Sequence, residues 1–134
     1  MYNMNNKKNK AFTLIELLAI LVILAILSLV LIPTVKNSIE EAKKDTYNNQ
    51  VAAINQAAES YFVNSNFSVS ENEEKVMYLT DIINQGYIES SKVINPIDES
   101  EMSGCVLIKY YSNQYHYSYI DNNKDCKKYT NISE

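Results

Sequence analysis

The sequence predicts an α+β protein in which one long N-terminal helix carries a small antiparallel sheet, giving a lollipop-shaped subunit. Three observations predict this fold class. A dense apolar run lies near the N-terminus, an amphipathic pattern with three- and four-residue steps follows it, and two β-rich runs flank a short turn late in the chain. The 134 residues are enough for one small domain and an anchor.

The apolar run is the first element. Residues 17–32 contain a single polar residue, Ser28. As a helix, the wider segment 12–35 would be roughly 36 Å long, which is enough to cross a bilayer. Lysines precede it and no acid does, so the positive-inside rule keeps the N-terminus cytoplasmic and the remainder outside. These lysines are Lys7, Lys8 and Lys10. A cleaved signal peptide is the alternative, but no A-x-A-like pair follows the run.

Two residues of this segment are unusual. Glu16 is its only charged residue, and a carboxylate at the centre of a bilayer costs about 2.5 to 3.5 kcal/mol. Because Glu16 lies near one end, either it reaches the interface or its charge has a function. Pro33 cannot donate to the carbonyl of Leu29 and clashes with that turn. It predicts a helix end or a kink, and we favour the kink because the helical pattern resumes at once.

The amphipathic pattern predicts the second half of the long helix. Apolar residues recur at three- and four-residue steps over residues 35–62, opposite a charged face. We expect the helix to continue to about Val63, so that from Phe12 it would be roughly 78 Å long. A two-chain coiled coil is the alternative, but the pattern drifts with a period of 3.6 instead of keeping a strict heptad.

The region after the helix gives weaker signals. Residues 64–74 are polar and predict a loop, in which Ser70 and Glu73 form a candidate capping box. Residues 79–86 predict one or two helical turns, with Thr80 as the N-cap and a glycine as the stop. The following segment, up to the Asn-Pro turn before residue 97, predicts extended or irregular chain.

The strongest β signal is a hairpin over residues 105–120, with its turn at residues 112–114. Since a two-stranded ribbon is marginally stable alone, we expect a third strand within residues 87–94. Three alternate tyrosines of the second strand share one face, and we expect them to pack against the long helix. They are Tyr115, Tyr117 and Tyr119. His116 points the other way and is expected at the surface.

Composition limits the function. The chain has 12 lysines, no arginine and 16 acids, and from Phe12 onward the balance is −7. This charge argues against direct binding of nucleic acid, which needs clustered basic residues. We find no nucleophile paired with a base, no metal-spaced cluster of histidine and cysteine, and only two glycines. We therefore expect no enzymatic activity and no cofactor.

The stretch Lys10-Ala11-Phe12-Thr13-Leu14-Ile15-Glu16 resembles the processing site of type IV prepilins. The shared features are a short basic leader, a small residue, phenylalanine, three residues, glutamate and an apolar helix. Most members have glycine where this chain has Ala11. Pro33 also falls where many pilins carry a helix-kinking proline.

The resemblance implies a maturation and assembly pathway. A prepilin peptidase would cut between Ala11 and Phe12 on the cytoplasmic side and methylate the new amine of Phe12. Mature subunits would then polymerise with identical or related pilin subunits, driven by a platform protein in the inner or plasma membrane and a cytoplasmic ATPase. Glu16 would pair with the cationic Phe12 end of a neighbouring subunit, because attraction between charges is strong in a low dielectric.

The expected organisation has three parts: a cleaved leader (1–11), a transmembrane and polymerisation helix (12–35) and an extracytoplasmic globular domain (36–134). The chain would be a single-pass membrane protein before assembly and part of a cell-surface filament afterwards. The filament would serve adhesion, motility, DNA uptake or secretion. The alternative is a membrane-anchored ectodomain that binds a ligand or catalyses a reaction without polymerising.

Two late features concern the outer domain. Cys105 and Cys126 would lie outside the membrane, where oxidation is allowed, and many pilins close a C-terminal loop with such a bridge. Two free thiols are the alternative. Asp121, Asn123 and Asp125 form D-x-N-x-D, the opening of a calcium loop. The rest of an EF-hand is absent, so we favour a polar turn over a calcium site.

Overall fold

The computed structural model describes residues 11–134; residues 1–10, which include the three lysines of the predicted leader 1–11, lie outside the described part. The chain forms two compact units: the first ends at Ile39, and the second begins at Glu40. The secondary structure, in chain order, is α1 (Leu14–Asn64), β1 (Glu74–Tyr78), α2 (Leu79–Asn84), a 3-10 turn η1 (Ser90–Lys92), β2 (Cys105–Tyr111), β3 (Gln114–Ile120), α3 (Asn123–Cys126) and β4 (Thr130–Asn131). The α+β class predicted from the sequence is confirmed.

The described part of the first unit, residues 11–39, is helix apart from its first three residues. Every residue from Ala11 to Ile39 is exposed, although most of them are apolar. The window of highest hydropathy in α1 is long and apolar enough to cross a membrane, and none of it is buried. A helix that is apolar on all sides and covered by nothing in its own chain is typical of a membrane segment.

The second unit is built on a four-stranded sheet with the order β3-β2-β1-β4. Strand β2 pairs antiparallel with β1 and β3, whereas β4 pairs parallel with β1. The sheet is therefore mixed, and the antiparallel sheet that we expected is wrong at its β4 edge. The third strand is also not where we expected it, because residues 87–94 contain η1 and an isolated bridge from Ile94 to Glu101.

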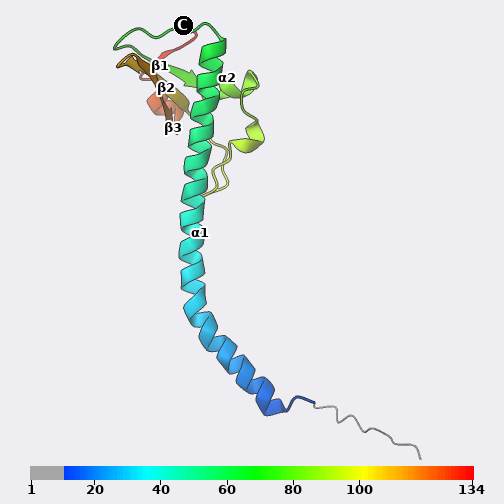
Figure 1. The fold of residues 1–134 in the computed structure, drawn as a ribbon. Coiled ribbons are helices and arrows are strands. Elements are labelled where there is room, and N and C mark those ends of the chain that lie inside the picture. The colour runs from blue at the N-terminus through cyan, green and yellow to red at the C-terminus, as the bar shows by residue number, and fades with distance from the viewer. Residues whose placement is uncertain (1–10) are drawn as a thin grey trace, which may run out of the picture. The chain divides into compact units, whose positions relative to one another are not determined.

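The core of the second unit lies between one face of the sheet and the C-terminal part of α1 (Figure 1). Buried residues of α1 recur at three- and four-residue spacing and contact buried side chains of β1, β2 and α2. The buried residues of α1 are Ile54, Ala57, Ala58 and Phe62. The other face of the sheet carries a smaller cluster of Val76, Leu107 and the two cysteines. The apolar stripe predicted over residues 35–62 is therefore buried only in its C-terminal part, because Val35 and Ile39 are exposed and Val51 is half-buried.

Three local predictions are corrected. Ser70 and Glu73 do not begin a helix: the Ser70 N–H donates to Glu73 Oε2 at 2.9 Å and the Glu73 N–H to the Ser70 carbonyl at 3.0 Å, which closes a turn before β1. The Ser70 N–H also lowers the pKa of the Glu73 carboxyl. Helix α2 begins after Tyr78, without a side-chain cap, so Thr80 is not its N-cap. Strand β3 begins at Gln114, which shortens the predicted hairpin turn to two residues.

Candidate functional site

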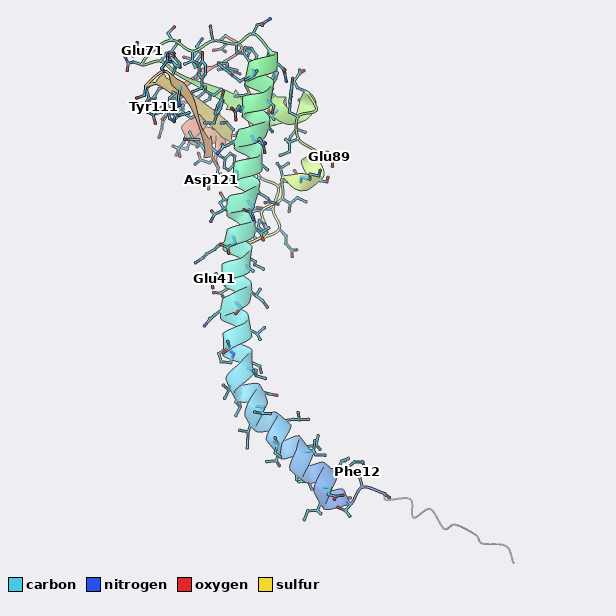
Figure 2. The ribbon with its side chains drawn as sticks, in the orientation of Figure 1. Phe12, Glu41, Glu71, Glu89, Tyr111 and Asp121 are labelled. Atoms are coloured by element: carbon cyan, nitrogen blue, oxygen red, sulfur yellow. A yellow bond between two sulfur atoms is a disulfide. The ribbon has the colours of Figure 1, made fainter. Side chains whose placement is uncertain are left out.

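The segment around Phe12 lies just before helix α1. Residues 11–13 are not helical, and the Phe12 side chain is 77% exposed (Figure 2). The first helical hydrogen bond joins the Leu17 N–H to the Thr13 carbonyl at 3.2 Å. The peptide bond between Ala11 and Phe12 therefore lies outside the regular helix, where its carbonyl is not committed to a helical hydrogen bond.

Thr13 and Glu16 form a reciprocal capping box at the start of α1. The Thr13 N–H donates to Glu16 Oε2 at 2.9 Å, and the Glu16 N–H donates to Thr13 Oγ1 at 3.3 Å. Two N–H groups that the helix itself cannot pair are thus satisfied. Glu16 was predicted as a site residue from the sequence, whereas Thr13 was not, although the T-x-x-E spacing of the two is typical of a capping box.

Glu16 is the only charged residue between Phe12 and Val35. Around it, the large apolar residues in the described range 12–39 are all exposed, from Ile20 at 47% to Leu14 at 82%. The hydroxyls of Ser28 and Thr34 are satisfied within the helix, because Ser28 Oγ donates to the Leu24 carbonyl and Thr34 Oγ1 to the Val30 carbonyl. The segment thus presents one anion on an otherwise apolar helix.

Pro33 lies inside α1, and helical backbone is present on both sides of it. The helix therefore does not end at this position. Proline removes one hydrogen bond to the preceding turn, which is why a kink here remains our prediction.

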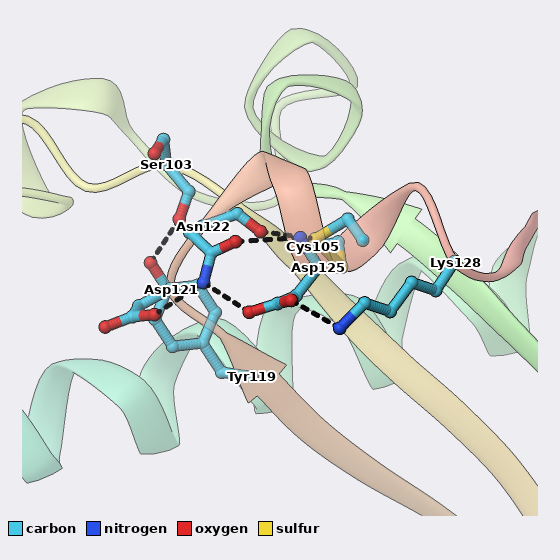
Figure 3. The surroundings of a disulfide bond; sticks show 8 residues. Ser103, Cys105, Tyr119, Asp121, Asn122, Asp125 and Lys128 are labelled. Carbon is cyan, nitrogen blue, oxygen red and sulfur yellow. Dashed lines mark hydrogen bonds and ion pairs between the residues drawn. A yellow bond between two sulfur atoms is a disulfide. The ribbon is translucent and has the colours of Figure 1, made fainter.

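Cys105 and Cys126 form a disulfide with an S–S distance of 2.12 Å (Figure 3). Both cysteines are completely buried on the outer face of the sheet, which is the face opposite to the one that packs against α1. The bridge joins the first residue of β2 to the last residue of α3. Since α3 has only four residues, the bridge is a main reason that this part of the chain has a fixed position.

The D-x-N-x-D stretch is a helix start held by its own hydrogen bonds. Asn122 caps α3, because its Oδ1 accepts the Asp125 N–H at 2.8 Å. The Asp125 carboxylate in turn accepts Lys128 Nζ at 2.7 Å and Asn122 Nδ2 at 2.8 Å (Figure 3). The Lys128 hydrogen bond is the main cause that lowers the pKa of Asp125. Among residues 11–134, no group of three or more histidine, cysteine, aspartate or glutamate side chains is placed to hold a metal ion.

The tyrosine row of β3 faces the helix. The ring of Tyr115 lies 4.7 Å from the ring of Phe62, and that of Tyr117 lies 6.1 Å from it. The Tyr119 hydroxyl donates to the Ser103 carbonyl. On the opposite face, His116 stacks on Tyr111 at 3.8 Å between ring centroids. The row is therefore packing, as predicted, and not a free aromatic surface.

Comparison with known proteins identifies the N-terminal segment. Residues 6–32 match the model of the prokaryotic N-terminal methylation motif, which is the cleavage and methylation segment of type IV prepilin-like proteins. The resemblance seen in the sequence is confirmed for this segment. No protein with a curated description and no protein of solved structure is significantly similar to the chain.

Proposed function

Since the chain carries a prokaryotic N-terminal methylation motif, we propose that it is a structural subunit of a type IV pilus or pseudopilus. The observation that carries this proposal is the place of Glu16 within the motif. It is the only charge on an exposed apolar helix, and it lies four residues after the residue that processing would make the new N-terminus.

Maturation would begin in the membrane. A prepilin peptidase cuts between Ala11 and Phe12 and methylates the Phe12 nitrogen. The non-helical, exposed position of both residues supports this step, because a peptidase needs access to the scissile carbonyl. Cleavage turns the neutral amide nitrogen of Phe12 into an amine, which stays cationic when it is methylated.

Assembly would then use the two new opposite charges. Each mature subunit carries a cation at Phe12 and an anion at Glu16, and a neighbouring subunit displaced along the fibre pairs its own cation with this anion. In a low-dielectric surrounding an isolated carboxylate is very costly, and pairing with a cation offsets much of that cost, so the pair favours docking. The exposed apolar helices bury one another in the same step.

The proposed partners follow from this pathway. They are identical or related pilin subunits, the prepilin peptidase, an assembly platform protein and a cytoplasmic ATPase. The subunit is held in the membrane by the apolar part of α1 before assembly and belongs to a surface filament afterwards. The disulfide supports an oxidising, extracytoplasmic location for residues Glu40–Glu134.

We also propose that the subunit is not an enzyme. Both cysteines are used in the disulfide, so neither thiol can act as a nucleophile. The one histidine borders a hollow of about 540 Å³ on the outer face of the sheet, where Lys109 and Glu74 already pair with each other at 2.5 Å. These contacts support a structural role for the globular unit.

Mass analysis of the N-terminus tests the proposal. The chain is recovered both from membranes and from material sheared off the cell surface. We expect 123 of the 134 residues, beginning with N-methylated Phe12, in both fractions. A chain that retains Met1 in every fraction contradicts processing. A processed chain that never occurs in the sheared material contradicts polymerisation and favours the non-polymerising ectodomain.

A further inference from the structure

The capping box ties Glu16 to its own chain before any partner is present. Only Oε2 of the carboxylate accepts the Thr13 N–H, at 2.9 Å. Oε1 accepts no hydrogen bond from any residue in the described range 11–134. The carboxylate is therefore oriented by one oxygen and available at the other.

We propose that Thr13 is a positioning residue for assembly. Its N–H binds Oε2 of the Glu16 carboxylate and its hydroxyl fixes the Glu16 backbone by accepting the Glu16 N–H, so that Oε1 is ready to receive the ammonium of a neighbouring subunit. This inference rests on the proposed function, in which Glu16 pairs with the cationic Phe12 end of that neighbour.

Two physical effects support a fixed Glu16. A glutamate side chain has many rotamers, and a neighbouring subunit that docks on a mobile carboxylate loses free energy by restricting them. The capping box restricts these rotamers before docking, so that this cost is smaller. The box also pairs the N–H groups of Thr13 and Glu16, which is important where no water is available to replace a lost partner. Helical side chains lean toward the N-terminus, which brings the Glu16 carboxylate toward the Phe12 end of the helix.

The test separates the hydroxyl of Thr13 from the charge of Glu16. Thr13→Val keeps the size and the backbone N–H but removes the hydroxyl that accepts the Glu16 N–H. Thr13→Ser retains that hydroxyl. Glu16→Gln retains an oxygen that accepts the Thr13 N–H but removes the negative charge. Thr34→Val is the matched control, because the Thr34 hydroxyl bonds only to the Val30 carbonyl within the same helix.

The full-length variants are produced in cells that assemble the wild-type chain. The sheared surface fraction is measured relative to mature chain in the membrane, so that differences in insertion or cleavage cancel. Loss of an N-cap predicts about five-fold less assembly for Thr13→Val, while Thr13→Ser and Thr34→Val assemble as the wild type does. Glu16→Gln is expected to reach the membrane, to be cleaved and to be absent from fibres.

The two ideas fail in different ways. Wild-type assembly of Thr13→Val, or a loss in Thr13→Ser as large as in Thr13→Val, overturns the positioning role and leaves the charge pairing intact. Wild-type assembly of Glu16→Gln overturns the charge pairing itself, and the positioning role with it.

Discussion

Among single residues, Gly104 has the strictest steric requirement. It has a φ of +112°, and a Cβ at this position would lie 1.9 Å from the Ile120 carbonyl oxygen. Its own carbonyl accepts the Leu79 N–H at 3.0 Å, so the backbone cannot move freely to relieve the clash. Gly104 therefore allows the chain before β2 to pass close to the end of β3.

We expect Gly104→Ala to destabilise the globular unit by more than about 3 kcal/mol, because strain at positive φ and a backbone clash add. Gly86→Ala is the matched control: its φ is +80° and nothing lies within 4 Å of the added Cβ, so it should cost only about 1 kcal/mol. Urea unfolding of the full-length chain in detergent, followed by near-UV circular dichroism, measures both. Equal losses would contradict the importance of the clash.

The raised pKa of Tyr117 predicts that the globular unit loses stability at alkaline pH. Burial, and then the negative charge of Glu59, raises its pKa to about 12, whereas a tyrosine in an unfolded chain has a pKa of about 10. Below pH 10 the phenol is neutral in both states. Between pH 10 and 12 only the unfolded chain releases the proton, so stability is lost as the pH rises through this window.

Tyr117→Phe should weaken this loss without removing it, because the pKa of Tyr119 is raised in the same way. Within residues 11–134 the Tyr117 hydroxyl has no hydrogen-bond partner, so the variant should melt at the wild-type temperature at pH 7. Thermal melting at a series of pH values from 7 to 11.5 measures the effect. An identical fall in melting temperature above pH 10 in both proteins would contradict it.

At the scale of elements, the β2–β3 hairpin depends on an unusual turn. Ser112 and Asn113 both have positive φ, +53° and +62°, between the paired residues Tyr111 and Gln114. This is the conformation of a type I′ turn, which favours asparagine and glycine. Tyr110 supports it by donating its hydroxyl to Asn113 Oδ1 at 2.9 Å.

Substitutions at Ser112 therefore have opposite expected effects. Ser112→Asn should stabilise the globular unit by a few tenths of a kcal/mol, because asparagine tolerates positive φ. Ser112→Val should cost about 1 to 2 kcal/mol, because a β-branched side chain does not. Both keep the Tyr110–Asn113 hydrogen bond, and the melting temperatures of the two variants decide the result. A stable Ser112→Val protein would mean that the hairpin closes with another turn.

The elements differ in how far the sequence predicts them. The hairpin and α1 have local signals, two β-rich runs around a short turn and an apolar period of 3.6, and both were predicted within one or two residues. Strand β1 was missed because only its last three residues are apolar, whereas Glu74 and Lys75 continue the polar stretch that precedes it. Its partner β2 is far along the chain, and β4 has only two residues, so long-range pairing and not local sequence determines both.

The N-terminal site follows the same rule. Glu16 is conspicuous as a charge in an apolar run, whereas the roles predicted for Ala11 and Phe12 come from the resemblance to the prepilin processing site, whose motif is contiguous. The capping role of Thr13 could also have been predicted from T-x-x-E. The hydrogen bonds of Asp125 were harder to foresee, since D-x-N-x-D is compatible with an ion loop until Lys128 is known to lie beside it.

At the scale of the whole molecule, the two units are stabilised by different surroundings. Residues Ala11–Ile39 bury nothing within the chain, so their helix depends on lipid, detergent or neighbouring subunits. The second unit, Glu40–Glu134, has its own core and the only disulfide. Ten of the 11 tyrosines belong to the second unit, so near-UV circular dichroism reports on it almost alone.

Replacement of both cysteines by serine should therefore destabilise one unit and leave the other intact. The bridge spans 21 residues, and a loop of this size contributes about 3 kcal/mol in the chain-entropy model. For a unit of this size we expect the near-UV transition in detergent to fall by roughly 10 to 20 °C. Helical signal in the far UV should persist above that transition, because the micelle still covers the apolar half of α1. Simultaneous loss of both signals in the wild type and the variant would show that the two units unfold as one.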